Sequence, residues 1–214
     1  MAPYDSALPC YSALRASSRR ASEPACGVQG SFETAACVAG AGTFDAASLE
    51  PILDVIKNAP PDVRASIYVF YCEAISNVIH HAYRDTATAP KLWWTAALQI
   101  DRANRRYVFT VADEGGGLPR ASACSGRDEG LADRCWPALL DAHRPTRPEA
   151  RGQGLASFAR LARAFQGARL TVESDRTRCT YTEDAGAEVS TSADARKGVK
   201  IALDLAPETL GGAH

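Results

Sequence analysis

Three short segments of the chain combine carboxylate, amide and glycine residues in patterns that suit nucleotide chemistry. The first contains Glu73, Asn77 and His81, each four residues after the one before. On an α-helix this spacing places the three side chains along one stripe. The second segment is 113–117, Asp-Glu-Gly-Gly-Gly, and the third is 151–155, Arg-Gly-Gln-Gly-Leu. Together they predict a polar helix face, an acidic glycine turn and a glycine-rich helix start.

The helix segment carries residues that could handle a metal ion and a water molecule. The amide oxygen of Asn77 can ligate Mg²⁺, which prefers oxygen ligands, keeps several waters and bridges phosphates. Glu73, one turn earlier, could polarise a water for attack on a phosphate. The solvated face of an ordinary surface helix remains the alternative interpretation. His80 and His81 are interpreted as packing or rim residues, because a metal site needs more ligands than the sequence supplies.

The acidic glycine turn suits recognition of a base. Asp113 follows an apolar run, and a carboxylate at a strand end can accept a hydrogen bond from an exocyclic amine such as that of adenine. Gly115 and Gly117 allow positive φ and a close approach of a ligand to the backbone. An ordinary turn is the alternative, because Asp and Gly are common turn residues.

The third segment suits phosphate binding. Gly152 and Gly154 precede a predicted helix over 155–165, and backbone N–H groups at a helix start attract phosphate. A loop that merely begins a helix is the alternative. The chain contains no G-x-x-x-x-G-K-[ST] phosphate loop, and no helix directly follows the glycines at 115–117 as a Rossmann fingerprint requires.

Hydrophobic periodicity predicts the elements that position these segments. Helices are expected over 45–58, from 62 through the first segment, over 130–142 and over 155–165. Strands are expected within 28–39 and over 93–101, 107–112, 169–174, 179–183 and 199–205. The polar run 184–196 is expected to be an exposed loop. Helices and strands segregate along the chain, which favours an α+β two-layer sandwich with helices over one face of a mixed, mainly antiparallel sheet.

Length and composition limit the function classes. The chain has 214 residues, 46% of them hydrophobic, and a net charge of −1. One domain with extensions is expected, and no global field favours nucleic acid or an anionic membrane. Neither a transmembrane helix nor a secretory signal is expected, because the required apolar runs are missing. Seven cysteines without a C-x-x-C pair are expected to be free thiols in a reducing cytoplasm.

The ordered motifs E-x-x-x-N-x-x-x-H-A-Y, D-x-G-x-G and G-x-G-L resemble those of the GHKL ATPase superfamily. The wording of the first is most similar to the anti-sigma-factor serine kinases. The resemblance covers 45–206 and implies a Bergerat-type ATP-binding fold with ATP and Mg²⁺ as cofactors. It implies that Glu73 is the general base or orients water, that Asn77 holds Mg²⁺, and that Asp113 contacts the adenine amine.

The resemblance also assigns the glycines and the flanking segments. Gly115 and Gly117 would shape the adenine pocket, and Gly152 and Gly154 would meet the phosphates. Arg151 and Leu155 flank these glycines in the expected nucleotide site, although Arg151 is also compatible with a solvated loop. The ATP lid would be 118–151, longer than in a minimal anti-sigma kinase. Residues 1–44 are expected to be a partly disordered extension with short strands, and 207–214 a tail.

Two functions follow from the resemblance. The first is transfer of the ATP γ-phosphate to a serine or threonine of a partner protein. The alternative is an ATPase or nucleotide-gated switch that controls partner binding or dimerisation. A binding module without turnover and a chance coincidence of motifs are further alternatives. A protein partner or substrate in a bacterial cytoplasm is expected, a homodimer is compatible, and neither nucleic acid nor a membrane is expected as a partner.

Overall fold

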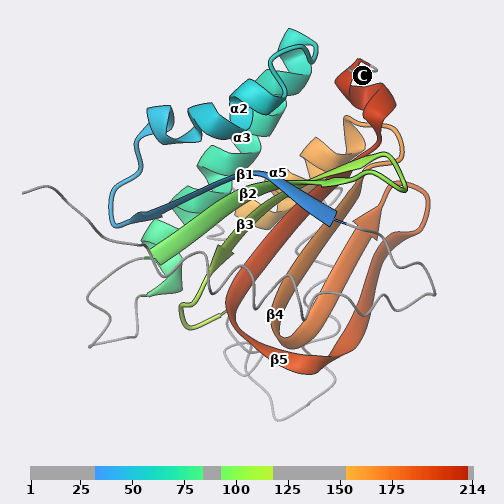
Figure 1. The fold of residues 1–214 in the computed structure, drawn as a ribbon. Coiled ribbons are helices and arrows are strands. Elements are labelled where there is room, and N and C mark those ends of the chain that lie inside the picture. The colour runs from blue at the N-terminus through green and yellow to red at the C-terminus, as the bar shows by residue number, and fades with distance from the viewer. Residues whose placement is uncertain (1–31, 84–92, 118–152, 212–214) are drawn as a thin grey trace, which may run out of the picture.

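The computed structural model describes residues 32–83, 93–117 and 153–211, which form a layer of helices over an antiparallel sheet (Figure 1). The helical elements are η1 (Ala46–Leu49), α2 (Glu50–Val55), α3 (Pro61–Asn77), η2 (Val78–Ala82), α5 (Gln153–Arg163) and η4 (Pro207–Leu210). The strands are β1 (Phe32–Ala41), β2 (Trp93–Asp101), β3 (Arg106–Asp113), β4 (Arg169–Thr182) and β5 (Gly186–Leu205). The α+β prediction is therefore confirmed. Within these ranges no helix has the length and apolar character needed to cross a membrane.

The sheet has the strand order β1-β2-β3-β5-β4, and every neighbouring pair is antiparallel. The prediction of a mixed sheet is thus wrong for the described strands. The chain passes from β3 through α5 to β4 without pairing those two strands. β5 then returns between them, and an antiparallel strand between two others leaves the outer two pointing the same way without contact.

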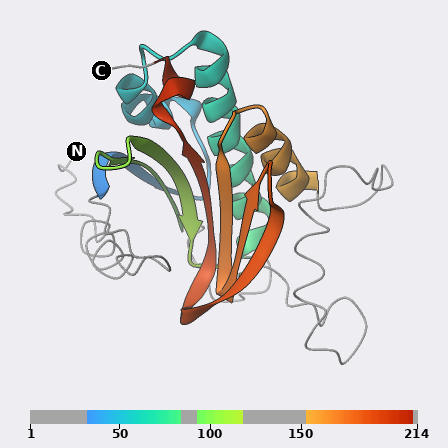
Figure 2. The ribbon, with the colours of Figure 1, turned by 90° about the vertical axis from the view of Figure 1, so that its right-hand side faces the viewer.

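The core lies between the sheet and the helices, which gather on one side of it (Figure 2). Tyr71 of α3 packs edge-on against Phe109 of β3, with ring centroids 6.3 Å apart. Its hydroxyl donates a hydrogen bond of 2.8 Å to the carbonyl oxygen of Ala97 in β2. The apolar residues spaced along one arc of α3, Ile67, Tyr71 and Ile75, are buried, and Val78 continues this buried face at the start of η2.

The start of the described chain belongs to the same sheet. β1 pairs with β2 along its length, so the sheet begins upstream of the boundary expected at residue 45. The helix expected over 45–58 is divided into η1 and α2. The carboxylate of Asp45 caps the first of these, accepting a 3.0 Å hydrogen bond from the Ala47 amide.

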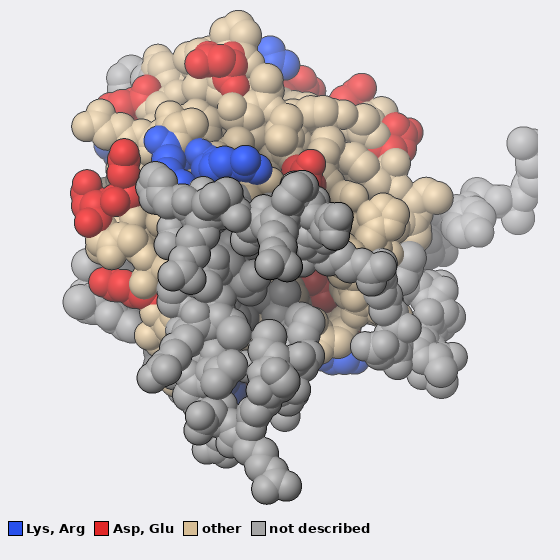
Figure 3. All heavy atoms as spheres, turned by 180° about the vertical axis from the view of Figure 1, so that it is seen from behind, with Lys and Arg blue, Asp and Glu red and all other residues tan. Residues whose placement is uncertain are grey.

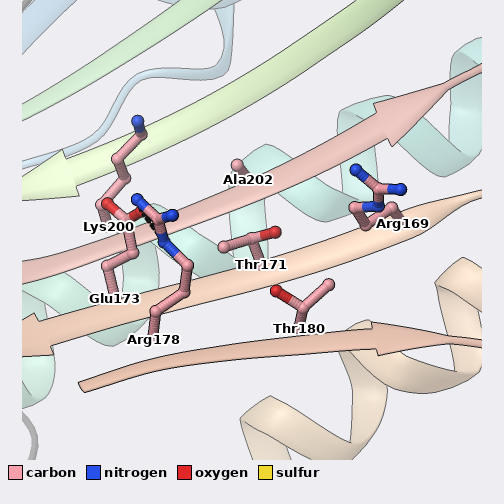
Figure 4. A pocket seen from close by; sticks show the side chains of 7 residues that line it. All are labelled: Arg169, Thr171, Glu173, Arg178, Thr180, Lys200 and Ala202. Atoms are coloured by element: carbon pink, nitrogen blue, oxygen red, sulfur yellow. Dashed lines mark hydrogen bonds and ion pairs between the residues drawn. The ribbon is translucent and has the colours of Figure 1, made fainter. Parts of the chain in front are cut away.

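The β4–β5 hairpin is longer than the sequence predicts. β5 is a strand from Gly186, and its first half pairs with the second half of β4, so the predicted loop over 184–196 is wrong. This half offers only small apolar residues such as Ala187 and Val189 to the core, which leaves a weak hydrophobic signal. The register shifts at Asp175, whose φ is +53°. There β4 turns back, so its two halves lie side by side (Figures 1 and 4).

Candidate functional site

The end of the α3–η2 helix contacts the turn that follows β3. The Gly116 amide donates a hydrogen bond of 2.7 Å to the carbonyl oxygen of Ala82. A Cβ atom at Gly115 would lie 2.2 Å from that same oxygen, which is closer than atoms can approach. Only glycine therefore lets the turn pack on the helix end. The structure thus brings the first and second sequence motifs together.

Tyr83 ties the same turn to β2. Its hydroxyl donates a 2.8 Å hydrogen bond to the carbonyl oxygen of Trp93 and accepts one of 3.3 Å from the Glu114 amide. The Ala-Tyr pair at the end of the first motif therefore positions the second motif. Both residues belong to the first motif, but their types alone do not predict this contact.

Asp113 is buried at the centre of this arrangement, with 4% of its surface exposed. One carboxylate oxygen accepts a 2.7 Å hydrogen bond from the Gly115 amide, and the other accepts one of 3.3 Å from the Val199 amide. Burial raises the pKa of this carboxyl, and the two amides and the charge of Arg196 oppose that shift. A carboxylate accepts about four hydrogen bonds, so capacity remains for an amine.

Gly198, which the sequence analysis left without a role, closes the site from β5. Its φ is +75°, and a Cβ there would lie 2.2 Å from the Asp113 carbonyl oxygen. Gly117 has a φ of +78°, and a Cβ there would lie 2.9 Å from the Ser174 hydroxyl oxygen. A lone glycine beside a strand signals such a close approach. Gly198 is such a lone glycine, because it lies directly before the strand predicted over 199–205 and after the loop predicted over 184–196.

Glu73 and Asn77 lie on the last turns of α3, where Glu73 is exposed and Asn77 is half-buried. Glu73 lies about two and a half helical turns before Ala82, the residue that contacts the turn, and Asn77 about one and a half turns before it. The π-helix η2 begins directly after Asn77. A π-turn closes its hydrogen bonds between residues i and i+5, so each residue rotates less about the helix axis than in an α-helix. The stripe predicted for Glu73, Asn77 and His81 therefore does not continue regularly to His81. Isolated π-turns are frequent at functional sites, so this irregularity marks the same end of the helix.

The helix α5 lies against α3. Phe158 packs edge-on against Phe70 of α3, with ring centroids 5.5 Å apart, and the two helices run in opposite directions (Figure 2). The start of α5 therefore lies on the same end of the layer as Glu73. The helix begins two residues earlier than predicted, so Gly154 and Leu155 belong to its first turn.

Several predicted site residues and elements are outside the described chain. Arg151 and Gly152 lie outside it, as do the helix predicted over 130–142 and the lid predicted over 118–151. Within the described ranges, no three His, Cys, Asp or Glu residues are grouped closely enough to hold a metal ion. Asn77 therefore fits Mg²⁺ only as one ligand among phosphate and water oxygens, the coordination that Mg²⁺ favours.

A comparison with models of known protein families gives no match to this chain, and a comparison with curated proteins gives none either. The assignment of the site therefore depends on the residues and on the geometry described above.

Proposed function

We propose that the protein binds ATP with Mg²⁺ in the manner of GHKL proteins, on a Bergerat-type fold, and transfers the γ-phosphate to a serine or threonine of a partner protein. One observation carries the proposal. The D-x-G-x-G turn packs on the end of the E-x-x-x-N helix through the Gly116–Ala82 hydrogen bond, with Asp113 buried between glycines. Two sequence motifs that are separate in the chain therefore belong to one site.

Each residue has a role that its surroundings support. The buried Asp113 carboxylate accepts the exocyclic amine of adenine. Gly198 keeps a side chain away from that carboxylate, because a Cβ there would lie 2.6 Å from one of its oxygens, and Gly115 and Gly117 let the turn approach Ala82 and Ser174. Asn77 offers its amide oxygen to the Mg²⁺ that bridges the phosphates. The first turn of α5, containing Gly154, offers backbone N–H groups to those phosphates.

Glu73 positions the nucleophile, either the hydroxyl of the acceptor protein or a water molecule. Its exposure to solvent favours a second candidate function, hydrolysis of ATP by a nucleotide-gated switch, because water reaches this carboxylate freely. In both functions the same pocket binds the nucleotide, and they differ in the acceptor of the phosphate.

ATP binding with Mg²⁺, measured by calorimetry, tests the shared part of the proposal. Asp113→Asn is expected to weaken binding by about 1.5–3 kcal/mol, the usual contribution of a hydrogen bond to a charged group, or about tenfold to a hundredfold. Asp101→Asn is the matched control, because Asp101 is equally buried and accepts backbone amides of the β2–β3 turn. Unchanged affinity in Asp113→Asn, or no ATP binding by the wild type, refutes the proposal.

The fate of γ-labelled ATP distinguishes the two functions. Free phosphate that disappears in Glu73→Ala, while ATP still binds, assigns the chain as an ATPase. Bound ATP without phosphate release, together with labelling of a serine or threonine in an added partner, assigns it as a kinase. Turnover that survives in Glu73→Ala removes Glu73 from the mechanism.

A further inference from the structure

A cavity of about 240 Å³ lies on the face of the sheet opposite the helices (Figure 4). Along β4, the buried residues Leu170 and Val172 point toward the core, so the alternate residues Thr171 and Glu173 point to the other face. The fold-back of β4 adds its second half to this surface. The polar lining comprises three cations, two hydroxyls and one carboxylate: Arg169, Arg178, Lys200, Thr171, Thr180 and Glu173.

The charges of this lining do not cancel. Arg178 donates a 2.8 Å hydrogen bond from Nε to one oxygen of Glu173, and its Nη2 lies 2.8 Å from the same oxygen in an ion pair. That pair leaves Arg169 and Lys200 as the excess charge of the cavity. Asp204, the cross-strand partner of Arg169, forms a 2.5 Å ion pair with Arg106, and the charge of Arg169 also lowers the pKa of its carboxyl.

Lys200 is poorly compensated in this lining. Among the described residues its ammonium forms no ion pair, and Glu173 supplies the attraction that it does feel. Burial lowers the pKa of Lys200, and the charges of Arg196 and Arg178 lower it further. An anion in the cavity would relieve this repulsion.

We propose that this cavity binds a phosphate group, either as the free ion or as the terminal group of a small ligand, beside Lys200. Arginine and lysine are the side chains that bind phosphate most effectively. The hydroxyls of Thr171 and Thr180 line the middle of the cavity, with Lys200 at one end and Arg169 at the other (Figure 4). The volume is below that of a typical site for a drug-sized ligand, which suits a single anionic group.

This site is separate from the candidate nucleotide site. Val199 of β5 donates its amide to Asp113, whereas the side chain of its neighbour Lys200 lines the cavity on the other face. Phosphate binding in this cavity therefore does not depend on the proposed nucleotide binding.

Titration of the isotope-labelled full chain with inorganic phosphate, followed by amide NMR shifts at constant ionic strength, tests the proposal. Saturable shifts are expected at Thr171, Glu173, Thr180 and Lys200. Lys200→Met is expected to weaken this binding about tenfold, the lower range for a hydrogen bond between charged groups. Lys197→Met removes the same charge from an exposed position three residues away, and its affinity is expected to match the wild type.

Three results would overturn the proposal. The first is shifts that rise linearly with phosphate, or that equal concentrations of chloride reproduce. The second is saturable shifts confined to α5, which would place the phosphate in the candidate nucleotide site. The third is an affinity that Lys200→Met leaves unchanged. If Lys200→Met does not fold, the test is whether phosphate shifts the amide signals of Thr171, Glu173, Thr180 and Lys200 in the wild type. A wild type that responds to succinate but not to phosphate also refutes the proposal.

Discussion

Replacement of Gly115 by alanine tests whether the turn after β3 packs on the helix end as described. The new Cβ would lie 2.2 Å from the Ala82 carbonyl oxygen, 2.7 Å from its carbon and 2.8 Å from the Ala82 Cβ. These atoms belong to backbone or to a short side chain, so the turn itself must move. Such overpacking costs about 1–3 kcal/mol. Loss of the Gly116–Ala82 hydrogen bond adds about 0.5–1.5 kcal/mol.

Gly116→Ala is the matched control. Its Cβ would lie 3.7 Å from the same carbonyl oxygen, an ordinary contact, and neither glycine has a positive φ. Both substitutions restrict the unfolded chain equally, so this effect cancels in the comparison. Urea unfolding is expected to place Gly115→Ala about 1.5–4.5 kcal/mol below Gly116→Ala in the free energy of unfolding. Agreement of the two variants to within about 0.5 kcal/mol would refute the packing argument.

Two further predictions concern ionisable groups away from the site. Arg106→Met removes the ion-pair partner of the largely buried Asp204 carboxylate, and urea unfolding is expected to show that the free energy of unfolding falls by about 1–3 kcal/mol. Arg102→Met breaks the exposed ion pair with Glu33, and its stability is expected to stay close to that of the wild type. Equal losses in the two variants would contradict the argument from burial. Burial raises the pKa of the Cys179 thiol from 9.0 to about 11, so the folded state disfavours the thiolate. Stability is therefore expected to fall more steeply in the wild type than in Cys179→Ala as the pH rises from 9 through about 11, and a constant difference between the two across that range would contradict it.

The sequence predicts those parts of the fold that bury large apolar side chains. The arc of Ile67, Tyr71 and Ile75 places the face of α3 on the sheet, and the strands β2 and β3 lie within one residue of their predicted bounds. The first half of β5 escapes prediction because Ala187 and Val189 supply little apolar area. Its pairing with β4 is held by backbone hydrogen bonds, which leave no pattern in side-chain polarity.

The candidate site was predictable in its residues but not in its contacts. Asp113, Gly115 and Gly117 were identified because their types and spacing limit the chemistry that they can do. The partners Ala82, Gly198 and Val199 act chiefly through backbone atoms, and a backbone amide or carbonyl is present at every position whatever the side chain. Only the folded arrangement distinguishes the few that meet Asp113.

The insertion of β5 between β3 and β4 also sets when the surroundings of Asp113 can form. The Val199 amide that binds its carboxylate lies 86 residues later in the chain. At about 5–20 residues per second, a ribosome needs about 4–17 s to add that stretch. Until then the outer edge of β3 has no strand to pair with, and closing so long a loop is a slow, non-local step. During synthesis, the hydrogen bond between Val199 and Asp113 therefore forms late, and its formation reports that β5 has joined the sheet.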